Sequence, residues 1–337
     1  MRIDKAVILI FASLLLQSGN SSANGKETTS PEALISRALL QQDVWTDGTK
    51  PMLMRAEIQV TNAKGASVKG NYVLNWVSLS QWREEIRFAD YDRLRVGNAK
   101  GYWQKSALSY QPEFIFQLDT MIHLKDALRI GATQHFGKVR TREKNGVRCE
   151  CAEVKWTTAT DREMCFDQGS GALVSVEYPR DSFPREISRM EYDAFKKLDE
   201  KSVPYEIRAL RDGKIVAALT ILEIEKTTER DPSLFEAPVD AESWDHCDDM
   251  QQAVVATQAI PRYPQSARDN HVQGEVILYG VVEADGSVSH ITVIQQAAPE
   301  LVSAAVEAVR QWRYKPASCG HRPVRVEISI PVRFTLG

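Results

Sequence analysis

The sequence lacks the motifs by which most enzymes and nucleic-acid-binding proteins are recognised. It has no Gly-rich phosphate loop, no nucleophile-elbow motif and no pair of carboxylates that spacing would bring together. Its six histidines show no metal-ligand spacing, so neither a metal site nor a cofactor is expected. A formal net charge of −3 gives no electrostatic reason to expect nucleic acid as a partner. We therefore expect a binding protein without enzymatic activity.

Long apolar runs are also lacking, apart from one near the N-terminus. Arg2 and Lys5 precede an apolar run over residues 6–16, which is shorter than the roughly 20 residues of a membrane span. Ser21-Ser22-Ala23 then fits the small-x-small cleavage pattern of a signal peptide. Residues 1–23 are therefore predicted to be a signal peptide, and the protein to be periplasmic. An uncleaved membrane anchor is the alternative.

Cysteines are few, at five, and their odd number leaves at least one thiol unpaired. Cys149 and Cys151 fall on one face of a predicted strand, without a histidine or helix start adjacent in sequence. This favours a disulfide from one of them to Cys165 across a hairpin, and strand register favours Cys151. Cys247 and Cys319 flank the C-terminal region and are candidates for a second disulfide.

Alternation of apolar and polar residues is abundant over residues 30–230. Two helices are predicted, one beginning at Ser30-Pro31 and one over residues 114–128. The predicted strands cover residues 54–61, 68–79, 81–88, 93–97, 101–104, 149–156, 162–166, 173–178, 186–195, 205–210 and 215–225. A sheet of so many antiparallel strands must curl or close, so we predict an α+β chain that begins with a curved antiparallel β half-barrel.

Residues 231–258 break this rhythm, because they are polar, acidic and contain two prolines, and we interpret them as a linker. A second domain is predicted over residues 259–337. It has a short helix at 265–270, strands at 275–283 and 288–294, and an apolar helical stripe that begins after Pro299 and ends on Trp312. Pro316 would prevent this helix from passing Lys315. The final strand, residues 324–336, contains Pro331, which argues for an edge strand.

Several motifs of this second domain occur in a specific order: Tyr263-Pro264, Gly274, Asp285-Gly286, Trp312-x-Tyr314-x-Pro316 and the alternating final strand. In this order and spacing, residues 259–337 resemble the C-terminal domain of TonB-family energy transducers. We expect the following residues to form the core and turns of this module: Tyr263, Pro264, Gly274, Gly286, Trp312, Tyr314 and Pro316.

This resemblance implies a small antiparallel sheet with two helices that binds a short segment of an outer-membrane transporter by strand addition. The expected recognition edge consists of Val324, Arg325, Val326, Glu327, Ile328, Ser329, Ile330, Pro331, Val332, Arg333 and Phe334. An edge that pairs with itself in a homodimer is the alternative. The chain departs from a typical transducer in that a folded β-rich domain replaces the long Pro-rich spacer.

The N-terminal region is similar to the LolA-like periplasmic lipoprotein carriers, whose curved sheet holds acyl chains in an apolar concavity. This resemblance implies an alternative role, in which the protein carries lipid or acyl chains and the TonB-like module serves for docking or dimerisation. Six aromatic residues could line such a concavity or could equally form an ordinary sheet core: Trp76, Trp82, Phe88, Trp103, Phe114 and Phe116.

Overall fold

The computed structural model describes residues 30–46, 48–62, 65–122, 128, 134–144, 146–156, 161–178, 189–227, 231–245, 247, 250–295 and 297–336. The predicted signal peptide lies outside these residues. Among the described residues, no helix has both the length and the apolar character needed to cross a membrane.

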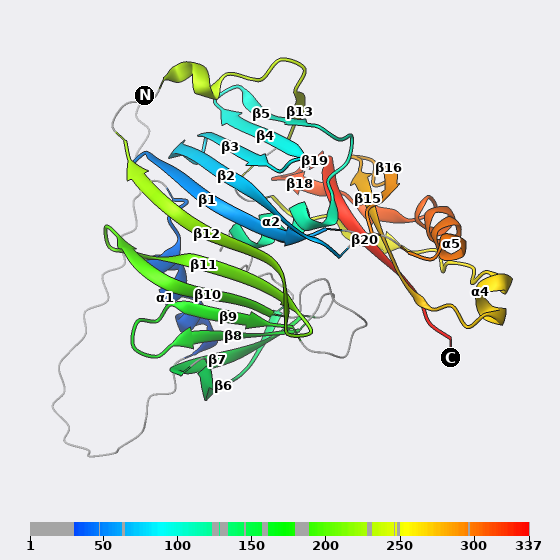
Figure 1. The fold of residues 1–337 in the computed structure, drawn as a ribbon, viewed down its shortest axis with the longest axis horizontal. Coiled ribbons are helices and arrows are strands. Elements are labelled where there is room, and N and C mark those ends of the chain that lie inside the picture. The colour runs from blue at the N-terminus through cyan, green and yellow to red at the C-terminus, as the bar shows by residue number, and fades with distance from the viewer. Residues whose placement is uncertain are drawn as a thin grey trace, which may run out of the picture.

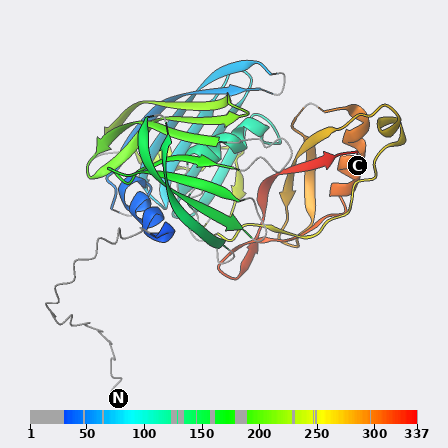
Figure 2. The same cartoon turned by 90° about the horizontal axis from the view of Figure 1, so that it is seen from below.

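The N-terminal region forms a 13-stranded antiparallel sheet in the order β13-β5-β4-β3-β2-β1-β12-β11-β10-β9-β8-β7-β6. Because β13 and β6 stand at opposite ends of this order, the sheet curls without closing into a barrel (Figures 1 and 2). The predicted curved antiparallel fold is therefore confirmed. The strands are β1 Met52–Thr61, β2 Ser67–Ser78, β3 Gln81–Arg87, β4 Asp92–Asn98, β5 Gly101–Ser106, β6 Gln134–Lys144, β7 Val147–Trp156, β8 Arg162–Asp167, β9 Leu173–Glu177, β10 Arg189–Leu198, β11 Lys201–Arg211, β12 Lys214–Lys226 and β13 Glu242–Trp244.

Two helices, α1 (Pro31–Gln42) and α2 (Glu113–Ile122), pack against one face of this sheet and share its core. The Ser30 hydroxyl caps α1 by accepting from the Ala33 amide at 3.2 Å, and a proline occupies the first helical position, as the sequence predicts. Leu34, Ile35 and Ala38 are at most 1% exposed, because they lie on the face of α1 that meets the sheet.

The C-terminal region is built around a three-stranded sheet in the order β16-β15-β20. Its strands are β15 Gly274–Val282, β16 Val288–Val293 and β20 Val326–Phe334, and its helices are α4 Gln265–Asp269 and α5 Pro299–Val309. Two further pairs are β14 Val254–Thr257 with β17 Arg313–Lys315, and β18 Ala317–Cys319 with β19 Arg322–Val324. Figure 2 shows this region beside the curled sheet.

The structure corrects the predicted end of the last helix. Helix α5 ends at Val309, and the Trp312 amide donates to the Val309 carbonyl in a tight turn (3.0 Å). The chain then enters β17, where the Tyr314 amide donates to the Gly286 carbonyl (2.8 Å). Trp312 is 4% exposed and packs in the core of the module. It is therefore buried as predicted, but it reaches the core from the turn after α5 and not from the helix itself.

The region interpreted as a linker also carries structure. It contains a 3₁₀-helix, Pro232–Phe235, together with β13 and β14. Strand β13 pairs with β5 of the large sheet, whereas β14 pairs with β17 of the C-terminal region. The linker therefore joins both regions by strand pairing.

Candidate functional site

Within the described residues, β20 lies at the edge of the three-stranded sheet and pairs with β15 on one side. The Ile294 amide donates to the Ile277 carbonyl at 3.0 Å, so the backbone groups of Ile277 face β16. Pro331 stands opposite Ile277 in the β15–β20 register. Its backbone nitrogen therefore points away from β15, toward the outer edge, where proline removes no ladder hydrogen bond.

Side chains of β20 alternate between two environments. Ile330, Val332 and Phe334 are at most 2% exposed and pack in the core formed with the helices. Pro331 and Arg333 are exposed on the other face. The predicted unbroken strand from residue 324 to residue 336 is wrong, because residue 325 separates β19 from β20, which ends at Phe334.

The residues predicted to hold the module together occupy its core and turns. The Tyr263 hydroxyl donates to the Val272 carbonyl (2.6 Å), and its ring meets Phe334 edge-on with centroids 5.6 Å apart. The Trp312 indole donates to the Ala259 carbonyl (3.0 Å). Pro264 precedes α4, Gly274 begins β15, and Pro316 separates β17 from β18.

Gly286 occupies a turn that other residues would fit poorly. Its φ of +82° lies in the left-handed region, and a Cβ there would approach the Tyr314 carbonyl oxygen to 2.1 Å. This explains the Asp285-Gly286 signal, because the turn must pass directly over β17.

Glu327 joins the C-terminal sheet to the N-terminal domain. Its carboxylate accepts hydrogen bonds from the Tyr279 hydroxyl (2.9 Å) on β15 and from Gln104 Nε2 (3.2 Å) on β5. Gln111 also donates to it. Around this contact, Ile277 and Tyr279 pack with aromatic residues of the N-terminal domain and of β13. The face of the small sheet opposite its helices is thus covered by the N-terminal domain.

The linker strengthens this contact. The Arg325 guanidinium lies 4.1 Å from the centroid of the Trp244 ring and donates to the Ser243 carbonyl at 2.7 Å. Cys247 and Cys319 form a disulfide, as predicted, which ties the linker to β18. The large sheet, the linker and the small sheet are therefore in direct contact around β13.

A buried cluster of charges lies next to this junction. The Arg93 guanidinium is fully buried and donates to Glu84 (2.8 Å), Asp119 (2.6 and 2.9 Å) and Gln111 (2.9 Å). Burial by itself would lower the pKa of Arg93, but Asp119 and Glu84 raise that pKa well above its ordinary value. The guanidinium therefore stays charged. Arg95 supplies a second cation, 3.0 Å from Asp119 and 3.8 Å from Glu84, so the two arginines together balance the two carboxylates.

A cavity of about 430 Å³ lies between the large sheet, α2, the linker and the start of β20. Trp76, Trp82 and Phe116, all predicted from the sequence, are among its lining residues. Gly97 of β4 lies directly opposite Trp82 of β3. A Cβ at residue 97 would stand 2.6 Å from the indole nitrogen, so the glycine leaves the space that the Trp82 ring occupies. Glu327 also lines the cavity.

The other predicted aromatic residues lie elsewhere. Phe88 and Phe114 pack edge-on against each other, with centroids 5.1 Å apart, away from the residues that line the cavity. Trp103 alternates along β5 with Tyr102 and Gln104, which face the cavity and the interface, so its side chain lies on the opposite face.

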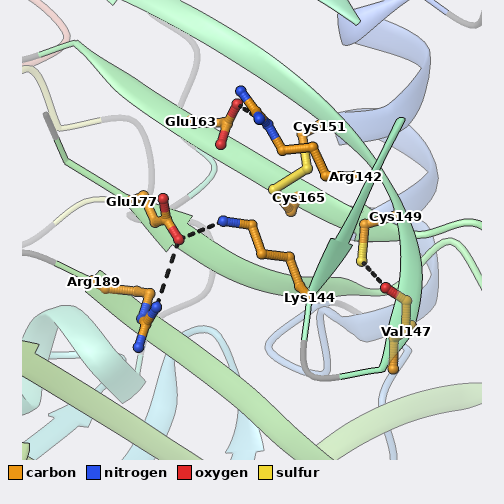
Figure 3. Close-up of a disulfide and its surroundings, with 9 residues drawn as sticks. All are labelled: Arg142, Lys144, Val147, Cys149, Cys151, Glu163, Cys165, Glu177 and Arg189. Atoms are coloured by element: carbon orange, nitrogen blue, oxygen red, sulfur yellow. Dashed lines mark hydrogen bonds and ion pairs between the residues drawn. A yellow bond between two sulfur atoms is a disulfide. The ribbon is translucent and has the colours of Figure 1, made fainter. Parts of the chain in front are cut away.

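The remaining cysteines gather on β7 and β8 (Figure 3), in a small cluster separate from the main core of the large sheet. Cys151 and Cys165 stand directly opposite each other on β7 and β8 and form a disulfide, as the register predicts. Cys149 keeps a buried thiol that donates to the Val147 carbonyl (3.4 Å). Burial, together with the charge of Asp167, raises the pKa of this thiol, so it stays protonated and unreactive at neutral pH.

Two ion pairs accompany this disulfide. Arg142 of β6 reaches Glu163 (2.9 Å), and Lys144 reaches Glu177 (2.6 Å), beside the cysteines (Figure 3). Glu163 lies close enough to Cys151 and Cys165 for shared metal binding, but both sulfurs are consumed by the disulfide. The cluster is therefore structural in this state.

Residues 259–336 match the family model described as the Gram-negative bacterial TonB protein C-terminal. By this match, the chain is TonB-like over its C-terminal region. Protein TonB of Vibrio cholerae is 34% identical over 85 residues, which are 25% of this chain and 35% of that protein. Protein TonB of Xanthomonas campestris is 34% identical over 77 residues, or 23% of this chain and 34% of that protein. The chain thus spans about a third of the length of these curated relatives.

Comparison with solved structures finds a LolA superfamily protein from Nitrosomonas europaea. It is 13% identical, with a TM-score of 0.39, over 62% of this chain and 98% of that protein.

The pairing of the buried charges and the Glu327 junction are not predicted from the sequence. One signal was available, because Glu84 occupies an inward position of β3 between Trp82 and Ile86, where an apolar residue would be expected. A charged residue at such a position implies a buried partner. The identity of that partner, Arg93, requires knowledge of the pairing of β3 with β4.

Proposed function

We propose that this protein is a non-enzymatic, periplasmic TonB-family protein that engages an outer-membrane transporter or another envelope partner by strand addition. The partner segment would add to the outer edge of β20. The proposal rests on the TonB-like match of the C-terminal region and on the edge position of β20.

The observation that carries the proposal is the direction of the β20 backbone. The backbone groups of Pro331 point to the outer edge, and those of Arg333, two residues on, point the same way. Those of Val332 point to β15. The edge therefore offers main-chain acceptors and the Arg333 amide to an incoming strand, which is the basis of β-augmentation.

The test is the substitution Arg333→Pro, which removes an outward amide and leaves the β15 ladder intact. We expect the module to fold and the affinity for peptides from outer-membrane transporters to fall about two- to tenfold, the range for one lost hydrogen bond. Titration calorimetry with the full mature chain would measure this change.

Two matched variants complete the design. Arg333→Ala removes the 2.8 Å ion pair to Glu275 but keeps the amide, so it separates side-chain from main-chain effects. Val332→Pro removes an inward amide and should unfold the module. Unchanged peptide affinity in a folded Arg333→Pro variant would exclude strand addition at this edge.

A further inference from the structure

We propose that the outer edge of β14 is a second docking surface, which takes an extended, acidic segment of a partner protein as an added strand. This surface is separate from β20, because β14 belongs to the two-stranded sheet that it forms with β17. The proposal therefore does not depend on strand addition at β20.

Strand β14 is paired along one edge only. It pairs with β17, and within the described residues no strand lies on its other side. All of its residues are exposed, among them Val254 at 49% and Val255 at 43%, and Ile260, which follows the strand, is 91% exposed. Apolar side chains that are exposed together in this way mark an interaction surface.

The edge of β14 lacks the charges that usually protect an exposed strand. Residues 250–261 contain no charged side chain. Natural edge strands are commonly protected by lysine or other charged residues, because an unprotected edge pairs with other chains. One protective feature is present, a register shift between Val255 and Thr257. An added strand would therefore pair regularly at Val255 and not at the bulge.

The backbone of Val255 points to this free edge. The Tyr314 amide donates to the Gly286 carbonyl at 2.8 Å, so the backbone groups of Tyr314 face away from β14. Val255 stands opposite Tyr314, and the backbone groups of two directly opposed residues in an antiparallel pair point either toward each other or away from each other. The amide and carbonyl of Val255 are therefore available to an added strand.

The two faces of this small sheet differ in character, which indicates the composition of the added strand. Arg313 and Lys315 point to one face of β17 and are exposed. Tyr314, between them, points to the other face, where Val255 lies opposite it. Because side chains of a strand alternate between the faces, the segment that fits best carries acidic residues at every second position and apolar residues between them.

The two cations are available to such a segment. Among the described residues of the C-terminal region, neither Arg313 nor Lys315 takes part in an ion pair. The Asp285 carboxylate interacts electrostatically with Arg313, but it accepts its hydrogen bonds from the Ser287 amide (2.8 Å) and hydroxyl (2.6 Å). An added strand would lie two strand spacings, about 10 Å, from β17. A lysine or arginine side chain and a glutamate side chain can bridge this span together.

The test uses three fluorescently labelled octapeptides that differ in one residue type. Valine alternates with glutamate in the first peptide, with glutamine in the second and with lysine in the third. Fluorescence anisotropy with the full mature chain should show the tightest binding for the glutamate peptide, by about two- to fivefold over the glutamine peptide for each cation that it engages. If the glutamine or lysine peptide bound as tightly as the glutamate peptide, or if none of the three bound, the proposal would be overturned.

Variants locate the peptide on β14. Arg313→Gln combined with Lys315→Gln should abolish the preference for glutamate, and it should fold because both side chains are exposed. Val255→Pro removes the outward amide, so the glutamate peptide should bind about two- to tenfold more weakly. Val255→Ala keeps this amide and is the matched control, with a smaller loss. If Val255→Pro fails to fold, the double glutamine variant carries the test, and an unchanged preference for glutamate in that variant would refute the proposal.

Two further comparisons exclude other sites and partners. Arg333→Pro should bind the glutamate peptide as tightly as the wild type. Loss of binding in Arg333→Pro, together with full binding in Val255→Pro, would place the peptide on β20 and contradict a second surface. Vesicles that contain phosphatidylglycerol test a membrane as the partner. If the wild type bound these vesicles through Arg313 and Lys315 and bound none of the peptides, the cations would serve a membrane surface, and the proposal would be wrong.

Discussion

The two sheets of this protein achieve burial in different ways. The large sheet covers one face with α1 and α2 and assembles a core from its own residues. The small sheet has three strands, and both of its faces are covered: one by its own helices, the other by the N-terminal domain. A sheet of so few strands buries little apolar surface alone, so contact with a larger neighbour supplies part of its stability.

The difference extends to polar groups. In the large sheet, Arg93 and its two carboxylates all come from the same domain, so the cluster is complete without the C-terminal module. Glu327, in contrast, takes two of its three donors from the N-terminal domain. The small sheet is therefore more dependent on docking than the large one, and its disulfide to the linker should matter more.

The two disulfides test this dependence directly. Cys247–Cys319 closes 72 residues, whereas Cys151–Cys165 closes 14 residues within one pair of strands. Loop-closure entropy predicts losses of about 4.4 and about 3 kcal/mol, respectively, when each pair is replaced by serine. Guanidinium unfolding of both double variants would measure the difference. If both double variants lost the same free energy of unfolding, the Cys247–Cys319 disulfide would not contribute more than the local one, and the small sheet would not depend on it.

A substitution in the buried charge cluster should disturb the large sheet. Arg93→Met removes one of the two cations and leaves the buried Glu84 without its closest partner, which should lower the free energy of unfolding by about 3–5 kcal/mol. Urea midpoints would measure this loss. Combining Arg93→Met with Glu84→Gln should restore part of it, because Arg95 and Asp119 then remain as a balanced ion pair.

The matched control is Arg55→Met. Arg55 also pairs with a carboxylate, that of Glu223, but both side chains are more than 40% exposed. We expect a change within about 1 kcal/mol. If Arg55→Met lowered the free energy of unfolding as much as Arg93→Met, burial of the ion pair would not explain the size of the loss.

The sequence predicts most strands well, because one face of each strand is buried and the other is exposed to solvent, so that apolar and polar residues alternate. It also predicts the pairing of Cys151 with Cys165, which follows from local register. Strand β6 was missed because its residues are mostly polar and exposed, as befits the edge of a sheet. The contact of Glu327 with Gln104 spans 223 residues, so no local pattern can reveal it. The cavity was predicted only through its aromatic residues, since its walls are set by the docking of the domains.

The smallest expected effect concerns Tyr279, which links the two sheets through Glu327. Burial raises the pKa of its phenol, and the Glu327 carboxylate raises it further. The unfolded chain therefore loses this proton first, near pH 10, while the folded protein keeps it. The unfolded state then binds fewer protons, so the contribution of Tyr279 to stability is complete below about pH 10 and is lost as the pH rises further.

Tyr279→Phe isolates this contribution. At neutral pH, the variant should be less stable by about 1 kcal/mol, because one hydrogen bond to Glu327 is lost. Above about pH 10, its stability should fall less steeply than that of the wild type, by up to about 1.4 kcal/mol per pH unit. The other buried tyrosines are common to both proteins, so their titration cancels in the comparison. Urea unfolding at neutral pH and at two alkaline pH values would show the two stabilities converging, and parallel curves would contradict a buried, neutral Tyr279 at the junction of the sheets.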